Sequence, residues 1–227
     1  MDVRRALESH SGVGESPIWP AAALITAAAL YADLPTRFIS GAGGGSFQVL
    51  RWVVPALTLL FVASLGALPV VGRITRRHLI IGTIALVSAA NLASIVLLIE
   101  VLLHGSIDPN AASELLRAAV HMWAVNVLLF GLWYWQHDGG GPRARPDCPA
   151  HKRDFLFPQQ LEPVFADSGW SPHFLDYLYV SFTNSTAFSP TDTMPLSRWA
   201  KMLMLVQSAI SLALAVMVVA RAVNILH

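Results

Sequence analysis

A run of polar side chains precedes the last long apolar stretch, and its residue types could support ion binding. The hydroxyl and amide groups between residues 181 and 193 are Ser181, Thr183, Asn184, Ser185, Thr186, Ser189, Thr191 and Thr193. Pro190 and Pro195 interrupt the run, so a helix here should stop partway and present the negative end of its dipole to a cation. Asp176 could bind such a cation or cap a neighbouring helix. We expect a pore-like polar cleft lined by Asp176, Ser181, Thr183, Asn184, Thr186, Ser189 and Asp192.

Ionisable residues at the ends of two neighbouring apolar stretches form a second candidate site. Glu100 and Arg117 are equally far from the centre of the intervening turn, so they should lie at similar depth and form a buried ion pair. His104 and His121 each follow one of them by four residues, which places each histidine on the helix face of its neighbour. The pattern favours a structural staple, that is, an ion pair that holds the two helices of the hairpin together. A proton or ion relay and a haem held by the two histidines are the alternatives.

No catalytic or metal-binding motif accompanies these residues. The chain has no GxSxG or HExxH stretch, and its single cysteine, Cys148, excludes an intrachain disulfide and a multi-cysteine metal site. The glycine-rich stretch Gly41–Ser46 has no phosphate-loop lysine. We therefore expect no enzyme activity, no cofactor and no metal.

The composition indicates a membrane protein. Hydrophobic residues make up 55% of the 227 residues, charged residues only 13%, and the mean hydropathy is +0.55. Soluble domains carry about 25% charged residues, so an ordinary cytosolic enzyme is excluded, as are a disordered chain and a basic nucleic-acid binder. Uncharged stretches of about 20 residues predict four transmembrane helices: Trp52–Gly72, Leu79–Ile99, Ala118–His137 and Met202–Ala220. Ser16–Ala32 predicts a fifth helix, with a cleaved signal peptide as the alternative.

These elements predict an all-α, polytopic transmembrane helical bundle with a re-entrant, pore-loop-like half-helix before the last span. The expected organisation is a four-helix transmembrane region (1–138), a polar Pro/Gly-rich loop (139–171), and a pore-helix-like segment with the last span (172–227). Serine is a good N-cap and proline suits the first helical position, so the half-helix should run from 172 to about 185 with Ser171 as its cap. A complete extra span over residues 173–189 is the alternative.

The distribution of positive charge predicts the topology. The N-terminus, the loop between the second and third helices and the loop 139–171 together carry nine Lys and Arg residues, whereas the opposite side carries two. Cytoplasmic loops are enriched in these residues. We therefore expect the N-terminus and the loop 139–171 in the cytoplasm.

The polar run also resembles known proteins. FLDYLYVSFTNSTAFSPTD, then SRWAKML and a long apolar helix, resembles the pore helix, filter and inner helix of two-helix potassium-channel pore domains. More closely, it resembles a domain-of-unknown-function family of bacterial inner-membrane proteins. The matching residues are Asp176, Leu178, Tyr179, Ser181, Phe182, Thr183, Phe188, Asp192, Ser197, Arg198 and Asn224. The resemblance covers 172–225 and implies a multi-pass protein of the cell inner membrane.

The stretch in the place of the filter departs from that of a channel. Residues 186–192 contain no glycine, so their carbonyls are not expected all to point inward, and potassium selectivity is not expected. The sequence predicts a channel-like or transport-related protein whose half-helix lines a cavity. The alternative is a non-conducting accessory or structural subunit of a membrane complex, which would bury this segment in a dry bundle. The expected partners are the lipid bilayer and either further copies of the chain or a larger membrane complex, but not nucleic acid.

Overall fold

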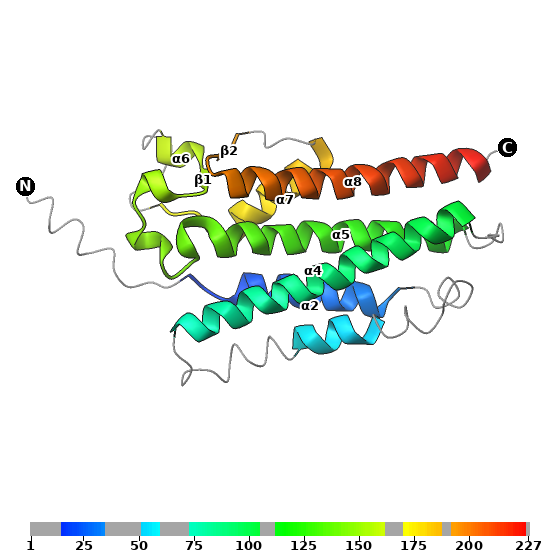
Figure 1. Cartoon of the computed structure of the whole chain (residues 1–227), viewed down its shortest axis with the longest axis horizontal. Helices are drawn as coiled ribbons and strands as arrows, with labels where there is room; N and C mark the ends of the chain where they lie inside the picture. Colours follow the sequence, from blue (N-terminus) through cyan, green and yellow to red (C-terminus); the bar gives the residue numbers. More distant parts are fainter. Residues whose placement is uncertain are drawn as a thin grey trace, which may run out of the picture. The chain divides into compact units, whose positions relative to one another are not determined.

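The computed structural model describes residues 15–34, 51–59, 73–104, 112–161, 170–187 and 192–225, and this part of the chain is predominantly helical (Figure 1). Its helices are α2 (Ile18–Ala32), α4 (Arg73–His104), α5 (Ala112–His137), α6 (Pro158–Leu161), α7 (Phe174–Ala187) and α8 (Arg198–Ile225). Residues 51–59 are also helical. Two short strands, β1 (Phe155–Leu156) and β2 (Met194–Pro195), complete the regular structure apart from three 3₁₀ turns.

Among the described residues, three helices are long and apolar enough to cross a membrane. The candidate spans are Arg77–Glu100, Leu116–Gly140 and Arg198–Val219, and they confirm long apolar helices at three of the four predicted spans. The fourth, Trp52–Gly72, lies mostly outside the described residues, and only its first part is seen to be helical. The helix predicted over Ser16–Ala32 is present as α2, but its 15 residues make it shorter than a complete span.

The chain forms two compact units, and each draws on segments far apart in the sequence. One unit comprises Met1–Pro20 and Phe130–Ser208, and the other comprises Ala21–Leu129 and Ala209–His227. Helices α5 and α8 therefore contribute residues to both units. The first unit contains the polar run, and the second contains Glu100 and Arg117.

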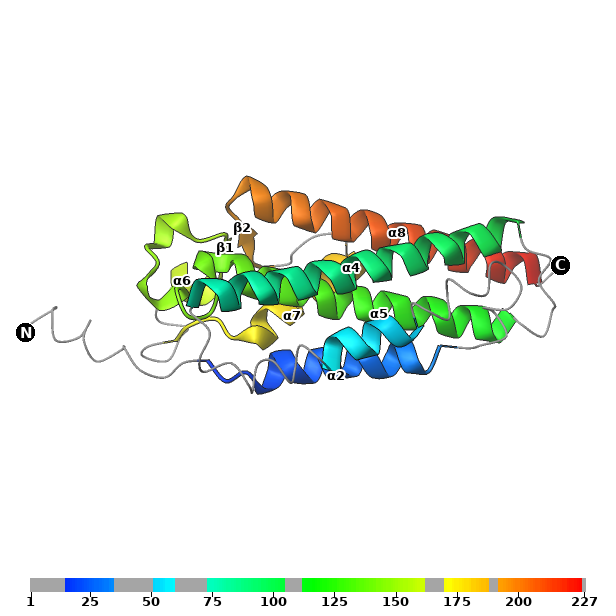
Figure 2. The ribbon, with the colours of Figure 1, turned by 60° about the horizontal axis from the view of Figure 1, so that its bottom comes forward.

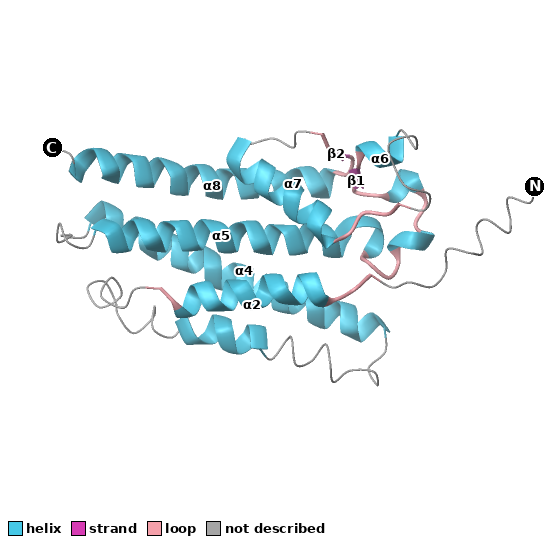
Figure 3. Ribbon diagram, turned by 180° about the vertical axis from the view of Figure 1, so that it is seen from behind, coloured by secondary structure: helices cyan, strands magenta, loops and turns pink. Residues whose placement is uncertain are grey.

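In the first unit, the chain before α7 pairs with the chain after it. Strands β1 and β2 are antiparallel, with Phe155 opposite Pro195 and Leu156 opposite Met194. The Leu196 N–H extends this ladder by donating to the Asp154 carbonyl at 2.8 Å. Figure 3 shows this small sheet beside the loops that connect α5 to α7.

The loop after α5 turns sharply and then folds back. Gly139, Gly140 and Gly141 all have positive φ, and a Cβ on Gly141 would lie 2.9 Å from the Gln136 carbonyl oxygen, so this turn requires glycine. Farther along the loop, Phe155 is completely enclosed, with its ring 5.1 Å from that of Tyr134. Burial of these aromatic rings fixes the middle of the loop to the first unit.

In the second unit, polar contacts connect the helices. The Tyr31 hydroxyl on α2 donates to Asn91 on α4 at 2.8 Å, and Asn126 on α5 donates to Ser211 on α8 at 3.4 Å. Arg51 donates to the Ala32 carbonyl at 2.7 Å. Because the last carbonyls of a helix have no partner within the helix, this guanidinium satisfies and electrostatically stabilises the end of α2.

Candidate functional site: the buried face of α7

Helix α7 begins at Phe174, two residues later than predicted, and two carboxylates accept the backbone N–H groups at its start. Asp176 accepts the His173 N–H at 2.7 Å, and Glu15, far away in the sequence, accepts the Phe174 N–H at 2.6 Å. Ser171 precedes the first helical residue by three positions and is not the N-cap, so that prediction was wrong. Carboxylates at the beginning of a helix satisfy unpaired N–H groups and complement the dipole.

The helix ends close to where the sequence predicts. α7 finishes at Ala187, and the described residues between Asp192 and Ser197 are not helical. Pro190, at which the sequence predicts the break, lies outside the described residues.

One side of α7 is buried against α8 through a glutamine. Gln207 is completely buried, and its amide nitrogen donates to the Ser181 carbonyl, to the Ser181 hydroxyl at 2.7 Å and to the Ser185 hydroxyl at 2.8 Å. Its amide oxygen accepts from the Tyr134 hydroxyl at 2.5 Å and from Asn184 at 2.9 Å. We call the five residues Tyr134, Ser181, Asn184, Ser185 and Gln207 the glutamine network.

The glutamine network contains its own donors and acceptors. Asn184 makes a further bond to the Met204 carbonyl at 3.0 Å and accepts from Ser208 at 3.2 Å. All five members of the network are buried. Buried polar groups that are mutually bonded stabilise a helix interface and need no water or ion to satisfy them.

Close packing accompanies these hydrogen bonds. On α5, a Cβ added to Gly131 would lie 3.2 Å from the Leu178 Cα, so the glycine lets the backbones of α5 and α7 approach closely. Figure 1 shows α7 beside the first part of α8, and Figure 2 shows α7 from a second side, below α8. Small residues at helix contacts are typical of bundles in membranes.

The structure divides the predicted cleft residues into separate groups. Ser181 and Asn184 belong to the glutamine network. Thr183 lies half-buried and Thr186 exposed, and each hydroxyl donates to a carbonyl of its own helix at 3.0 Å. Asp192 is exposed after the helix, and Ser189 lies outside the described residues.

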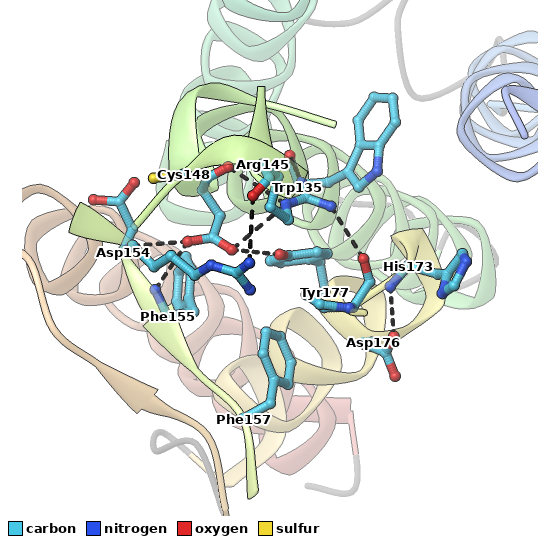
Figure 4. Close-up of polar contacts among 12 residues, drawn as sticks. Trp135, Arg145, Cys148, Asp154, Phe155, Phe157, His173, Asp176 and Tyr177 are labelled. Carbon is cyan, nitrogen blue, oxygen red and sulfur yellow. Dashed lines mark hydrogen bonds and ion pairs between the residues drawn. The ribbon is translucent and has the colours of Figure 1, made fainter. Parts of the chain in front are cut away.

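A second buried cluster surrounds Arg145 at the beginning of α7 (Figure 4). The guanidinium donates to the Trp135 carbonyl and to the Pro172 carbonyl at 3.1 Å. Its Nη1 lies 3.3 Å from a Glu15 oxygen and its Nε 3.6 Å from Oδ2 of Asp138. One arginine thus connects the end of α5, the start of α7 and the N-terminal segment.

Asp138 is the acceptor at the centre of this Arg145 cluster. Its Oδ1 accepts the backbone N–H groups of Asp154 at 2.7 Å and Phe155 at 3.1 Å, and its Oδ2 accepts the Tyr177 hydroxyl at 2.5 Å. Asp138 is completely buried. Burial raises the pKa of the Tyr177 hydroxyl well above its usual value; the Arg145 charge opposes this rise and the Asp138 carboxylate adds to it.

The predicted staple residues are not buried. Glu100 and Arg117 are both exposed in the structure, so the prediction of a buried pair was wrong in that respect, and their pairing stays a prediction. Arg117 donates to the Asp33 carbonyl at 3.4 Å, and His121 lies 3.7 Å from the Asp33 carboxylate. The loop that joins α4 to α5 lies outside the described residues.

Several residues of the two buried clusters were not among the site residues predicted from the sequence. Gln207 is a single amide inside an apolar span, and that position was a usable signal, because a polar group at membrane depth requires a partner. Glu15 and Arg145 gave no comparable signal, since they lie 130 residues apart. Within the described ranges, no three His, Cys, Asp or Glu side chains are grouped so that they could hold a metal ion.

Comparisons with known proteins add no assignment. No family model, no curated protein and no solved structure matches the chain. The class of protein therefore follows from the helices and from these two buried clusters alone: a predominantly helical chain with three helices able to span a membrane.

Proposed function

We propose that the chain is a multi-pass membrane protein that serves as a non-conducting accessory subunit of a membrane complex, with α7 as a sealed, pore-helix-like element. The observation that carries this proposal is the glutamine network. An ion pathway along α7 needs polar groups that are free to replace the hydration shell of an ion. Instead, the buried side chain of Gln207 forms hydrogen bonds with Ser181, Asn184 and Ser185 inside the bundle.

Geometry also supports a re-entrant α7. Its 14 residues extend about 21 Å, which is less than the hydrocarbon core of about 30 Å. The pairing of β1 with β2 brings the chain after α7 back beside the chain before it. Since both flanks of α7 meet, the segment is suited to entering and leaving from one side of the membrane.

The competing function is ion transport by a homo-oligomer. The observation that favours it is the outer face of α7, where Thr186 and the large side chains of Tyr179 and Phe182 are exposed. In a ring of copies, Thr183 and Thr186 could face a common axis. Each hydroxyl already donates its hydrogen to the helix backbone, and its oxygen lone pairs remain available for a cation.

Flux measurement and cross-linking together distinguish the two functions. Purified protein in liposomes should give no flux of potassium, sodium or protons above that of empty liposomes. A photo-reactive amino acid in place of Leu175, which is 46% exposed on α7, should form an adduct with a different protein in cells. Flux that Thr186→Val abolishes, together with adducts only between copies of this chain, would overturn the accessory role in favour of transport.

A further inference from the structure

Glu15 connects two segments that are far apart in the sequence. Its carboxylate uses one oxygen for the Phe174 N–H at 2.6 Å and the other for Nη1 of Arg145 at 3.3 Å. Its side chain is only 10% exposed, and that of Arg145 only 4%. The residue lies just before α2, which starts at Ile18. The N-terminal segment is thereby fastened to the first turn of α7.

We propose that Glu15 is a latch that holds the beginning of α7 through the N-terminal segment and can be released without unfolding the Arg145 cluster. The remaining contacts of the cluster do not pass through Glu15. Arg145 still bonds to the Trp135 and Pro172 carbonyls and still faces Asp138. Asp176 still caps the helix from within.

Release of the latch therefore has a defined consequence. The Phe174 N–H loses its acceptor, and Arg145 keeps one carboxylate partner instead of two. The first turn of α7 then has one cap in place of two, so it opens more often. Glu15, just before α2, thus contributes to the stability of the first turn of α7. This inference does not rest on the accessory role, since a latch could serve either function.

Hydrogen exchange in nanodiscs tests the latch at the residues concerned. In Glu15→Ala, the peptide covering residues 170–178 should exchange about tenfold faster at the Phe174 amide, because a bond from a backbone N–H to a carboxylate is lost. The matched control is Asp147→Ala, which removes an exposed carboxylate from the same unit and should leave this peptide unchanged.

A second variant keeps the test decisive if Glu15→Ala fails to fold. Glu15→Gln retains an oxygen for the Phe174 N–H but loses the charge that pairs with Arg145. The Phe174 amide of this variant should therefore exchange faster than in wild type and more slowly than in Glu15→Ala. If Glu15→Ala does not fold, the comparison is with wild type only. Unchanged exchange of residues 170–178 in both variants overturns the latch. Equally accelerated exchange across the β1–β2 sheet and α7 also overturns it, because Glu15 would then support the whole unit.

Discussion

Replacing Gln207 by methionine tests the glutamine network most sharply. Methionine has similar length and no hydrogen-bonding amide, so the substitution removes the polar contacts and keeps most of the packing. The Gln207 amide nitrogen has two hydrogens for three oxygens within reach, so one hydrogen is shared between two acceptors, and the amide oxygen accepts two further bonds. Loss of the amide leaves the Tyr134 hydroxyl in the bundle without its acceptor.

The expected cost can be estimated in two ways. Interhelical hydrogen bonds in membrane proteins average about 0.6 kcal/mol, so the four full bonds that the Gln207 amide can make sum to about 2.4 kcal/mol. A buried donor left without a partner costs about 1–3 kcal/mol, and Tyr134 is such a donor. These terms overlap at Tyr134, so we expect Gln207→Met to lower the free energy of unfolding by about 3 kcal/mol.

The chain provides a matched control for this measurement. Gln136 is also a buried glutamine in the first unit, but its side-chain oxygen has no hydrogen-bond partner among the residues that the structure describes. Gln136→Met should therefore change the free energy of unfolding by less than about 1 kcal/mol. Reversible unfolding in mixed micelles, followed by tryptophan fluorescence, compares the two variants. Equal costs for Gln136→Met and Gln207→Met would refute the reasoning.

Three further predictions concern the Arg145 cluster and the topology. Asp138→Asn should lower the free energy of unfolding by about 1.5–3 kcal/mol, because Tyr177 and Arg145 lose a charged acceptor while Glu15 still pairs with Arg145; a loss below about 1 kcal/mol in the same assay contradicts a coupled cluster. Because the pKa of Tyr177 is raised in the fold, its contribution to stability is complete below pH 10 and is lost as pH rises through the folded value. Wild type should therefore lose more stability than Tyr177→Phe between pH 9 and strongly alkaline pH, and parallel curves would contradict this. A membrane-impermeant thiol reagent applied to whole cells should miss Cys148, and ready labelling would reverse the predicted orientation.

The long helices could be predicted because the bilayer constrains them directly. Uncharged stretches near 79–99, 118–137 and 202–220 correspond to three helices able to span a membrane. The end of α7 near Ala187 could also be predicted, since the proline that follows is read directly from the sequence. Such features depend on neighbouring residues alone, so composition and spacing suffice.

The partners of the polar residues could not be predicted in the same way. Glu15 meets Phe174 across 159 residues, and Gln207 meets Tyr134 across 73. The sequence showed that the hydroxyl run of α7 is unusual, but it did not show which side of the helix would be buried. Glu100 and Arg117 lie at matching distances from a turn, yet both side chains are exposed and not buried. Equal depth in two helices does not determine which faces meet.

Water accessibility of the α7 face tests the central claim most directly. In a Cys148→Ser background, Ser185→Cys places a thiol of nearly the same size within the buried glutamine network, and Asp192→Cys places one at an exposed position after the helix. A charged thiol reagent applied to both sides of reconstituted membranes should label Asp192→Cys and leave Ser185→Cys unlabelled. Comparable labelling of both positions would show water beside the network and contradict a sealed α7.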